Sequence, residues 1–249
     1  MNFDKAAYRA SKDRVIQLIK ASHDWEKTEG FIADGVINPD VYALQPLRVL
    51  CVLAESYGYD ECGMTDIEDQ PQSDLMGVGN PTVKTPRRMA ALLRLFILTA
   101  ERGGAKVPRD EWEQMPRLLG TEAKSVAIHQ DTLSKIAWIN VKKASNPRGT
   151  KLDPGEAHSH AQRNRDILQE QIVAMAPHLM LICGRDAFAS LLHMQLLGPT
   201  ACEGKLWQLQ SMSDDAKFMQ VSHPAYFPDW GSYEALHRNY GLLHEQWWR

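Results

Sequence analysis

The run RVLCVLA at residues 48–54, with the segment ESYGYD that follows it at 55–60, decides the fold class. The run is short, almost continuously apolar and rich in β-branched residues, which is typical of a strand buried on both faces of a sheet. Two further runs have the same character, SKIAWIN at 134–140 and HLMLICG at 178–184. KLWQLQ at 205–210 and KFMQVSH at 217–223 alternate apolar and polar residues, so we interpret them as strands too.

Segments with helical spacing of apolar residues separate these strands, and the predicted helices cover 3–22, 85–101, 153–176, 185–195 and 232–247. The stretches 30–42 and 60–85 carry Gly, Asp, Asn and Pro and are interpreted as loops. Strands that alternate with helices predict an α/β fold, a three-layer α/β/α sandwich around a mostly parallel sheet of about four strands. We expect one domain over 1–249, with an N-terminal helical extension at 1–45.

The composition is that of an ordinary globular chain, with 44% hydrophobic and 24% charged residues among 249. No apolar stretch approaches the roughly 18 residues of a membrane span, and the first residues lack a signal-peptide core. We therefore expect a cytoplasmic protein with no membrane partner. The four cysteines lack metal-ligand spacing, and His158 and His160 have no partner carboxylates, so no metal site is predicted.

Polar residues stand where three of the predicted strands end. Glu55 and Asp60 follow the first strand, Asn140 ends the second, and His223 ends the last. Ligands of parallel sheets bind in the crevice outside the carboxyl ends of the strands. The sequence therefore predicts a functional site at this edge of the sheet.

Four segments, in their order along the chain, resemble the motifs of the uracil-DNA glycosylase superfamily. They are VLAESYGYD (52–60), IAWINVKK (136–143), LICGRDAFASL (181–191) and VSHPAYF (221–227). The chain departs from the family pattern at Ala54 and Tyr57 in the first motif, where Gly and Pro are usual, and at Ala225 in the last, where Ser is usual.

The resemblance implies a monofunctional DNA glycosylase that hydrolyses the bond between a flipped-out pyrimidine and its deoxyribose. Glu55 or Asp60 would stabilise the oxocarbenium ion and orient the attacking water, while His223 would donate a hydrogen bond to the departing base. Asn140 would bind one edge of the base. Because no lysine occupies a position suited to Schiff-base chemistry, hydrolysis without strand cleavage is expected.

The remaining expected site residues bind the base or the DNA. Tyr57, Gly58 and Tyr59 are candidates for the base pocket, and no cofactor, iron–sulfur cluster included, is expected. The net charge of −3 requires any DNA contact to come from a local basic face. For that face we nominate side chains near the helix start at Thr85 and after Asn140, with two aromatics as a wedge into the duplex: Lys84, Arg87, Arg88, Lys142, Lys143, Tyr226 and Phe227.

The motifs are compatible with several substrates and activities. Gly58 stands where uracil-specific relatives carry a bulky Tyr, which leaves room beside C5 of a pyrimidine. This favours a hypermodified base such as glucosylated hydroxymethylcytosine in phage DNA, and hence an enzyme of antiviral defence. We expect the protein to be a monomer. The alternatives are a uracil-DNA repair glycosylase, a catalytically inactive DNA- or nucleotide-binding module on the same fold, and a hydrolase of free nucleosides.

Overall fold

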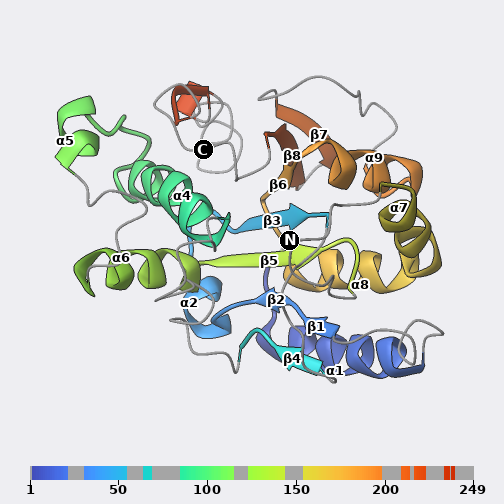
Figure 1. Cartoon of the computed structure of the whole chain (residues 1–249). Coiled ribbons are helices and arrows are strands. Elements are labelled where there is room, and N and C mark those ends of the chain that lie inside the picture. The colour runs from blue at the N-terminus through green and yellow to red at the C-terminus, as the bar shows by residue number, and fades with distance from the viewer. Residues whose placement is uncertain are drawn as a thin grey trace.

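The computed structural model describes residues 2–21, 31–54, 64–68, 85–114, 123–143, 154–197, 209–213, 216–222, 233–235 and 237–238. A six-stranded sheet with the order β2-β5-β3-β6-β8-β7 forms the centre of this part of the chain (Figure 1). Its strands are β2 (Gly35–Val36), β5 (Ile136–Asn140), β3 (Val49–Leu53), β6 (Leu179–Cys183), β8 (Ala216–Val221) and β7 (Leu209–Ser213).

The four inner strands are mutually parallel, whereas β2 and β7 run antiparallel along the two edges. The apolar runs centred on 48–54, 134–140 and 178–184 become β3, β5 and β6, as expected. Every described residue of β3 and β6 is buried, which explains why these runs are almost continuously apolar. The predicted mostly parallel α/β sandwich is confirmed. The sheet has six strands where about four are expected, and its edge strand β7 overlaps the segment 205–210 that the sequence predicts as a strand.

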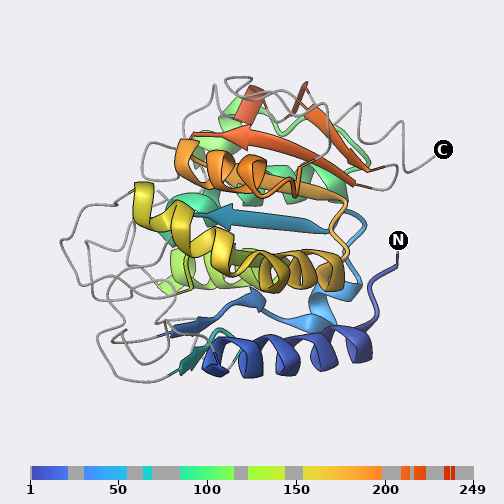
Figure 2. The same ribbon diagram turned by 90° about the vertical axis from the view of Figure 1, so that its right-hand side faces the viewer.

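Helices cover both faces of the sheet (Figure 2). One face carries α4 (Thr85–Glu101) and α6 (Ala123–Ser134), with α5 (Arg109–Gln114) between them in the chain. The other carries α7 (Pro154–Arg163), α8 (Arg165–Met175) and α9 (Arg185–His193), and α1 (Lys5–Ala21) packs against α8. The helix expected over 153–176 is divided at Asn164, which lies between α7 and α8. None of the helices in the described part of the chain is long and apolar enough to cross a membrane.

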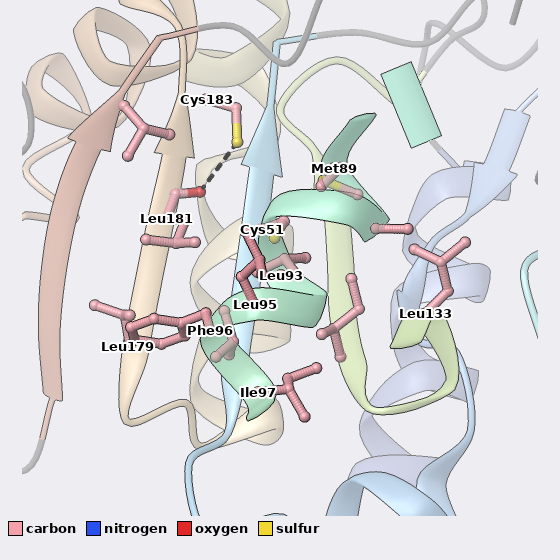
Figure 3. Packing of buried hydrophobic residues seen from close by; sticks show 14 of the residues in the cluster. Cys51, Met89, Leu93, Leu95, Phe96, Ile97, Leu133, Leu179, Leu181 and Cys183 are labelled. Carbon is pink, nitrogen blue, oxygen red and sulfur yellow. Dashed lines mark hydrogen bonds between the residues drawn. The ribbon is translucent and has the colours of Figure 1, made fainter. Parts of the chain in front are cut away.

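The core between α4 and the sheet consists of closely packed apolar side chains (Figure 3). Leu93 and Phe96 of α4 lie against strand residues that include Cys51 and Cys183, all of them buried. A hydrogen bond with Cys183, together with burial, raises the pKa of the Cys51 thiol well above its usual value. Both cysteines are free thiols of the core, as their positions in apolar runs predict.

The interpretation of residues 30–42 as a loop is wrong. This segment forms β1 (Phe31–Ala33), β2 and the short helix α2 (Pro39–Ala43). Asn38 caps α2, since its side-chain oxygen accepts hydrogen bonds from two backbone N–H groups, and Pro39 occupies the first turn. β1 pairs in parallel with β4 (Met64–Asp66), which lies within the second stretch interpreted as a loop. Turn-forming residues therefore mark the ends of very short elements here.

The N-terminal segment is also part of the main sheet and not an appended extension. β2 pairs with the outer side of β5, with Gly35 opposite Trp138. The Tyr8 hydroxyl of α1 accepts a 2.8 Å hydrogen bond from the backbone N–H of Val36, and Tyr8 itself is buried. Residues 5–21 and 31–43 are thus tied to the core by main-chain pairing and by a buried side chain.

Replacement of Gly35 by Ala is expected to lower the free energy of unfolding by about 1–3 kcal/mol, the usual cost of overpacking. A Cβ atom at Gly35 would stand 2.5 Å from the Tyr8 hydroxyl oxygen. Urea denaturation measures the change. In a Tyr8→Phe background the same substitution should cost less, because the clashing oxygen is gone; an equal cost in both backgrounds would contradict this explanation.

Candidate functional site

The carboxyl ends of the four parallel strands form one edge of the sheet. At this edge the connections that follow the strands lead to helices on opposite faces. From β3 the chain continues to α4 on one face, whereas from β5 and β6 it continues to α7 and α9 on the other. The neighbours β3 and β6 therefore form the switch point at which α/β sheets bind ligands. β3, β5 and β8 direct the segments that begin at Glu55, Val141 and Ser222 to this same edge.

Asn140 ends β5 beside Leu53, the last residue of β3, at this edge. β8 lies three strand positions from β5, a separation of roughly 14 Å by ordinary strand spacing. A base that contacts groups from both strand ends would therefore lie over β3 and β6. The other expected catalytic, base-binding and wedge residues lie outside the described residues: Glu55, Tyr57, Gly58, Tyr59, Asp60, His223, Tyr226 and Phe227.

A buried carboxylate holds Asn140 in place. Asp34, between β1 and β2, accepts hydrogen bonds at Oδ2 from the backbone nitrogen of Asn140 at 2.5 Å and from its side-chain Nδ2 at 3.1 Å. The first contact continues the hydrogen bonds between β2 and β5 beyond Gly35, the first residue of β2. There the Asp34 side chain takes the place of a main-chain acceptor. Because a carboxylate only accepts, the second contact fixes which end of the Asn140 amide faces Asp34.

Lys143 and Gln171 complete the surroundings of Asp34. The Lys143 ammonium donates to Asp34 Oδ1 at 2.6 Å, and Gln171 Nε2 of α8 donates to the same oxygen at 3.2 Å. The Asp34 and Lys143 side chains are 0% and 1% exposed. Burial lowers the pKa of the Lys143 ammonium, and the Asp34 carboxylate opposes that effect. The site therefore contains a buried ion pair with hydrogen-bond donors on both carboxylate oxygens.

Lys142 and Lys143 do not belong to an exposed basic rim, so this part of the sequence prediction is wrong. Lys142 Nζ binds Glu156 at 2.8 Å with its own side chain only 4% exposed, and the backbone N–H of Lys143 donates to His160 Nε2 at 3.0 Å. Both lysines turn inward because acceptors on β1–β2 and α7 lie within reach. His160, considered above as part of a metal motif, fixes the backbone that follows β5.

The side-chain oxygen of Asn140 accepts no hydrogen bond from the part of the chain that the structure describes. Asn140 Oδ1 is buried and has no hydrogen-bond partner among the described residues, and the same holds for Gln171 Oε1. A buried polar atom left unpaired costs about 1–3 kcal/mol. Asp34 engages the nitrogen end of both amides, so both oxygens face elsewhere. Asn140 Oδ1 therefore lies at a strand end on the edge where parallel sheets bind ligands, with its acceptor capacity unused by the described residues.

Of the expected DNA-binding residues near α4, the structure describes one side chain. Arg88 lies in the first turns of α4 and is half-buried. Arg87 belongs to the same helix, but its side chain lies outside the described residues, as does the whole of Lys84. In the chain α4 follows β3 and β4, so its first residue, Thr85, comes at the end of the connection that leaves the β3 strand end.

Sequence reasoning missed Asp34 and Gln171. Asp34 stands in FIADGVI, where the residues from Ala33 to Ile37 are all buried. A single acidic residue inside an apolar stretch was the available signal, since a buried carboxylate needs partners. Gln171 gave no such signal, because it lies on a helix whose neighbouring positions also include polar residues.

The geometry alone therefore defines a strand-end amide oriented by a buried carboxylate. No protein-family model matches the chain, and a comparison with curated proteins finds no match either.

Proposed function

We propose that this protein is a monofunctional DNA glycosylase that hydrolyses the N-glycosidic bond of a flipped-out pyrimidine and leaves an abasic site. The observation that carries the proposal is Asn140 at the carboxyl end of β5. Its amide is oriented by Asp34, and its buried Oδ1 has no hydrogen-bond partner among the described residues. The motif resemblance supports it, because each of the four motifs spans the carboxyl end of a parallel strand at this edge.

An oriented amide suits the edge of a pyrimidine. Its oxygen accepts from a ring N–H or an exocyclic amino group, and the second Nδ2 proton remains to donate to a neighbouring acceptor. Such a bidentate contact supplies roughly 1–3 kcal/mol of discrimination between bases. A base taken out of the duplex exposes this edge, and the energy of the contact offsets part of the cost of flipping.

The chemistry needs a carboxylate near the sugar and a donor near the base. In the proposed reaction a water oxygen bonds to C1′ of the deoxyribose as the C1′–N bond breaks, and the bonding electrons leave with the base. Glu55 or Asp60, from the segment that follows β3, would stabilise the positive charge on the sugar and accept the proton of the water. His223, after β8, would donate to the oxygen of the departing base.

For the substrate we favour a 5-substituted cytosine, such as glucosylated hydroxymethylcytosine in phage DNA, which would make the enzyme part of antiviral defence. Gly58, in the segment after β3, leaves the C5 side of the base uncrowded under the motif alignment. With Lys142 and Lys143 buried, the proposed DNA contacts come from Lys84, Arg87 and Arg88 around the start of α4, where a helix N-terminus also favours phosphate.

The test is release of the base from defined DNA. The purified full chain is incubated with oligonucleotides that carry uracil, hydroxymethylcytosine or glucosylated hydroxymethylcytosine, and alkali then cleaves any abasic site. Breaks at the modified position after alkali, but not before, are the expected result. Intact strands for every base, with or without measurable DNA binding, would contradict the proposal.

Replacement of Asn140 by Ala is expected to lower kcat/KM for base release about tenfold or more, because the contact with the base is lost. Circular dichroism checks that the variant is folded, since Asp34 also loses one donor. Gln220 of β8 offers a matched control, because it too is a buried amide whose oxygen has no hydrogen-bond partner within the described ranges. Gln220→Met should leave kcat/KM within about twofold; equal losses in the two variants would indicate a general effect of amide removal on the fold.

A further inference from the structure

We infer that Asp34 is a positioning residue that fixes the orientation of the Asn140 amide and thereby decides whether the site accepts a 4-amino or a 4-oxo pyrimidine. The inference rests on the proposed function and extends it to substrate class. It starts from the contact of Asp34 Oδ2 with Asn140 Nδ2 at 3.1 Å, in a place where both side chains are buried.

The two ends of an amide are nearly the same size but opposite in hydrogen-bonding character. At its 4 and 3 positions a cytosine ring offers a donor and an acceptor, whereas a uracil ring offers an acceptor and a donor. One orientation of the Asn140 amide therefore pairs with one class of ring, and the flipped orientation pairs with the other. Whatever sets the orientation sets the discrimination.

Asp34 sets it because a carboxylate has no proton to donate. If the amide flipped, Asn140 Oδ1 would face Asp34 Oδ2, and two acceptors would meet in the protein interior. Asp34 cannot turn away, because its other oxygen binds Lys143 at 2.6 Å and Gln171 at 3.2 Å, and its backbone oxygen accepts from Gln171 at 3.1 Å. The backbone N–H of Asn140 holds Oδ2 as well.

Two double variants separate this role from the role of the ion pair in the fold. Asp34→Asn with Lys143→Met removes both charges but keeps an oxygen that can accept from Asn140, while Gln171 can rotate to accept from the new amide. Asp34→Ala with Lys143→Met removes the same charges and the acceptor as well. The two proteins carry the same charge and differ in the side chain at residue 34, and so in the acceptor that it offers to the Asn140 amide, to the Asn140 backbone N–H and to Gln171.

The measured quantity is the ratio of kcat/KM for 4-amino and 4-oxo bases that share one 5-substituent. The probes are oligonucleotides with cytosine against uracil, and with hydroxymethylcytosine against hydroxymethyluracil, the latter two with and without glucose. We expect the Ala double variant to lose about tenfold or more of the wild-type discrimination and the Asn double variant to retain it. General damage to the fold would lower both rates together and leave the ratio unchanged.

Wild-type discrimination in both double variants, or its equal loss in both, would overturn the inference. A wild type that releases no base refutes the proposed function. In that case, or if the Ala double variant does not fold, a second measurement tests the role of Asp34. Hydrogen exchange of the Asn140 side-chain protons, identified in NMR spectra by their loss in Asn140→Ser, reports the contact directly. A slowly exchanging Nδ2 proton in the wild type supports the orienting role of Asp34, and exchange as fast as that of a surface amide overturns it.

Discussion

Replacement of Glu55 by Gln, or of Asp60 by Asn, is expected to reduce base release about a thousandfold while DNA binding persists. Two unit charges about 4 Å apart attract by roughly 4 kcal/mol at an effective dielectric near 20. Each 1.36 kcal/mol of transition-state stabilisation is about tenfold in rate, so one carboxylate near the oxocarbenium carbon supplies an effect of this size. Both substitutions keep the shape of the side chain and remove its charge.

Single-turnover rates of abasic-site formation, with binding measured separately on the same oligonucleotide, check this prediction. Glu101→Gln is a matched control, because this exposed carboxylate of α4 binds Lys135 at 3.0 Å and is not part of the proposed site. It should leave the rate within about twofold of the wild type. If both Glu55→Gln and Asp60→Asn release the base at near-normal rates, neither carboxylate has the proposed role.

Replacement of Lys143 by Met is expected to lower the free energy of unfolding by about 3–5 kcal/mol, because Asp34 is then left as a buried charge without its counter-ion. The pair is 2.6 Å apart with both side chains excluded from solvent. Addition of Asp34→Asn should restore most of the lost stability, since a neutral pair carries no uncompensated charge. Urea denaturation of the four proteins of this cycle gives the coupling between the two residues.

The neighbouring lysine provides the control. Lys142 also has a buried stem and an acidic partner, but that partner, Glu156, is 56% exposed. When Lys142 is replaced by Met, Glu156 remains solvated, so the cost should stay below about 1 kcal/mol. A cost for Lys143→Met no larger than that for Lys142→Met would show that the buried pair does not stabilise the fold.

The parallel core could be predicted from the sequence because a strand buried on both faces is a continuous run of apolar residues. β3 and β6 are apolar at every position, and Asn140 stands out as the polar residue that ends the apolar run of β5. These features are local. The edge strand β2 has no comparable signal in the sequence, since it has only 2 residues and lies among residues that usually form turns.

The interior of the site could not be predicted, because its contacts join distant parts of the chain. Asp34 and Lys143 are 109 positions apart, and Asp34 and Gln171 are 137 apart. A lysine after a strand is ordinarily exposed, and only a buried acceptor supplied by another segment draws it inward. The sequence therefore predicts an exposed Lys143 and gives no indication that Asp34 binds it.

The short strand β2 also has a consequence for the behaviour of the protein in a crowded cell. It covers the outer backbone groups of β5, which would otherwise form an open edge on a parallel, strongly apolar sheet. Open edges of this kind recruit strands from other chains and promote aggregation. A nascent or proteolysed chain in which residues 31–36 have not docked would expose that edge and leave Lys143 without its counter-ion. Self-association and loss of the oriented Asn140 amide would then share one cause.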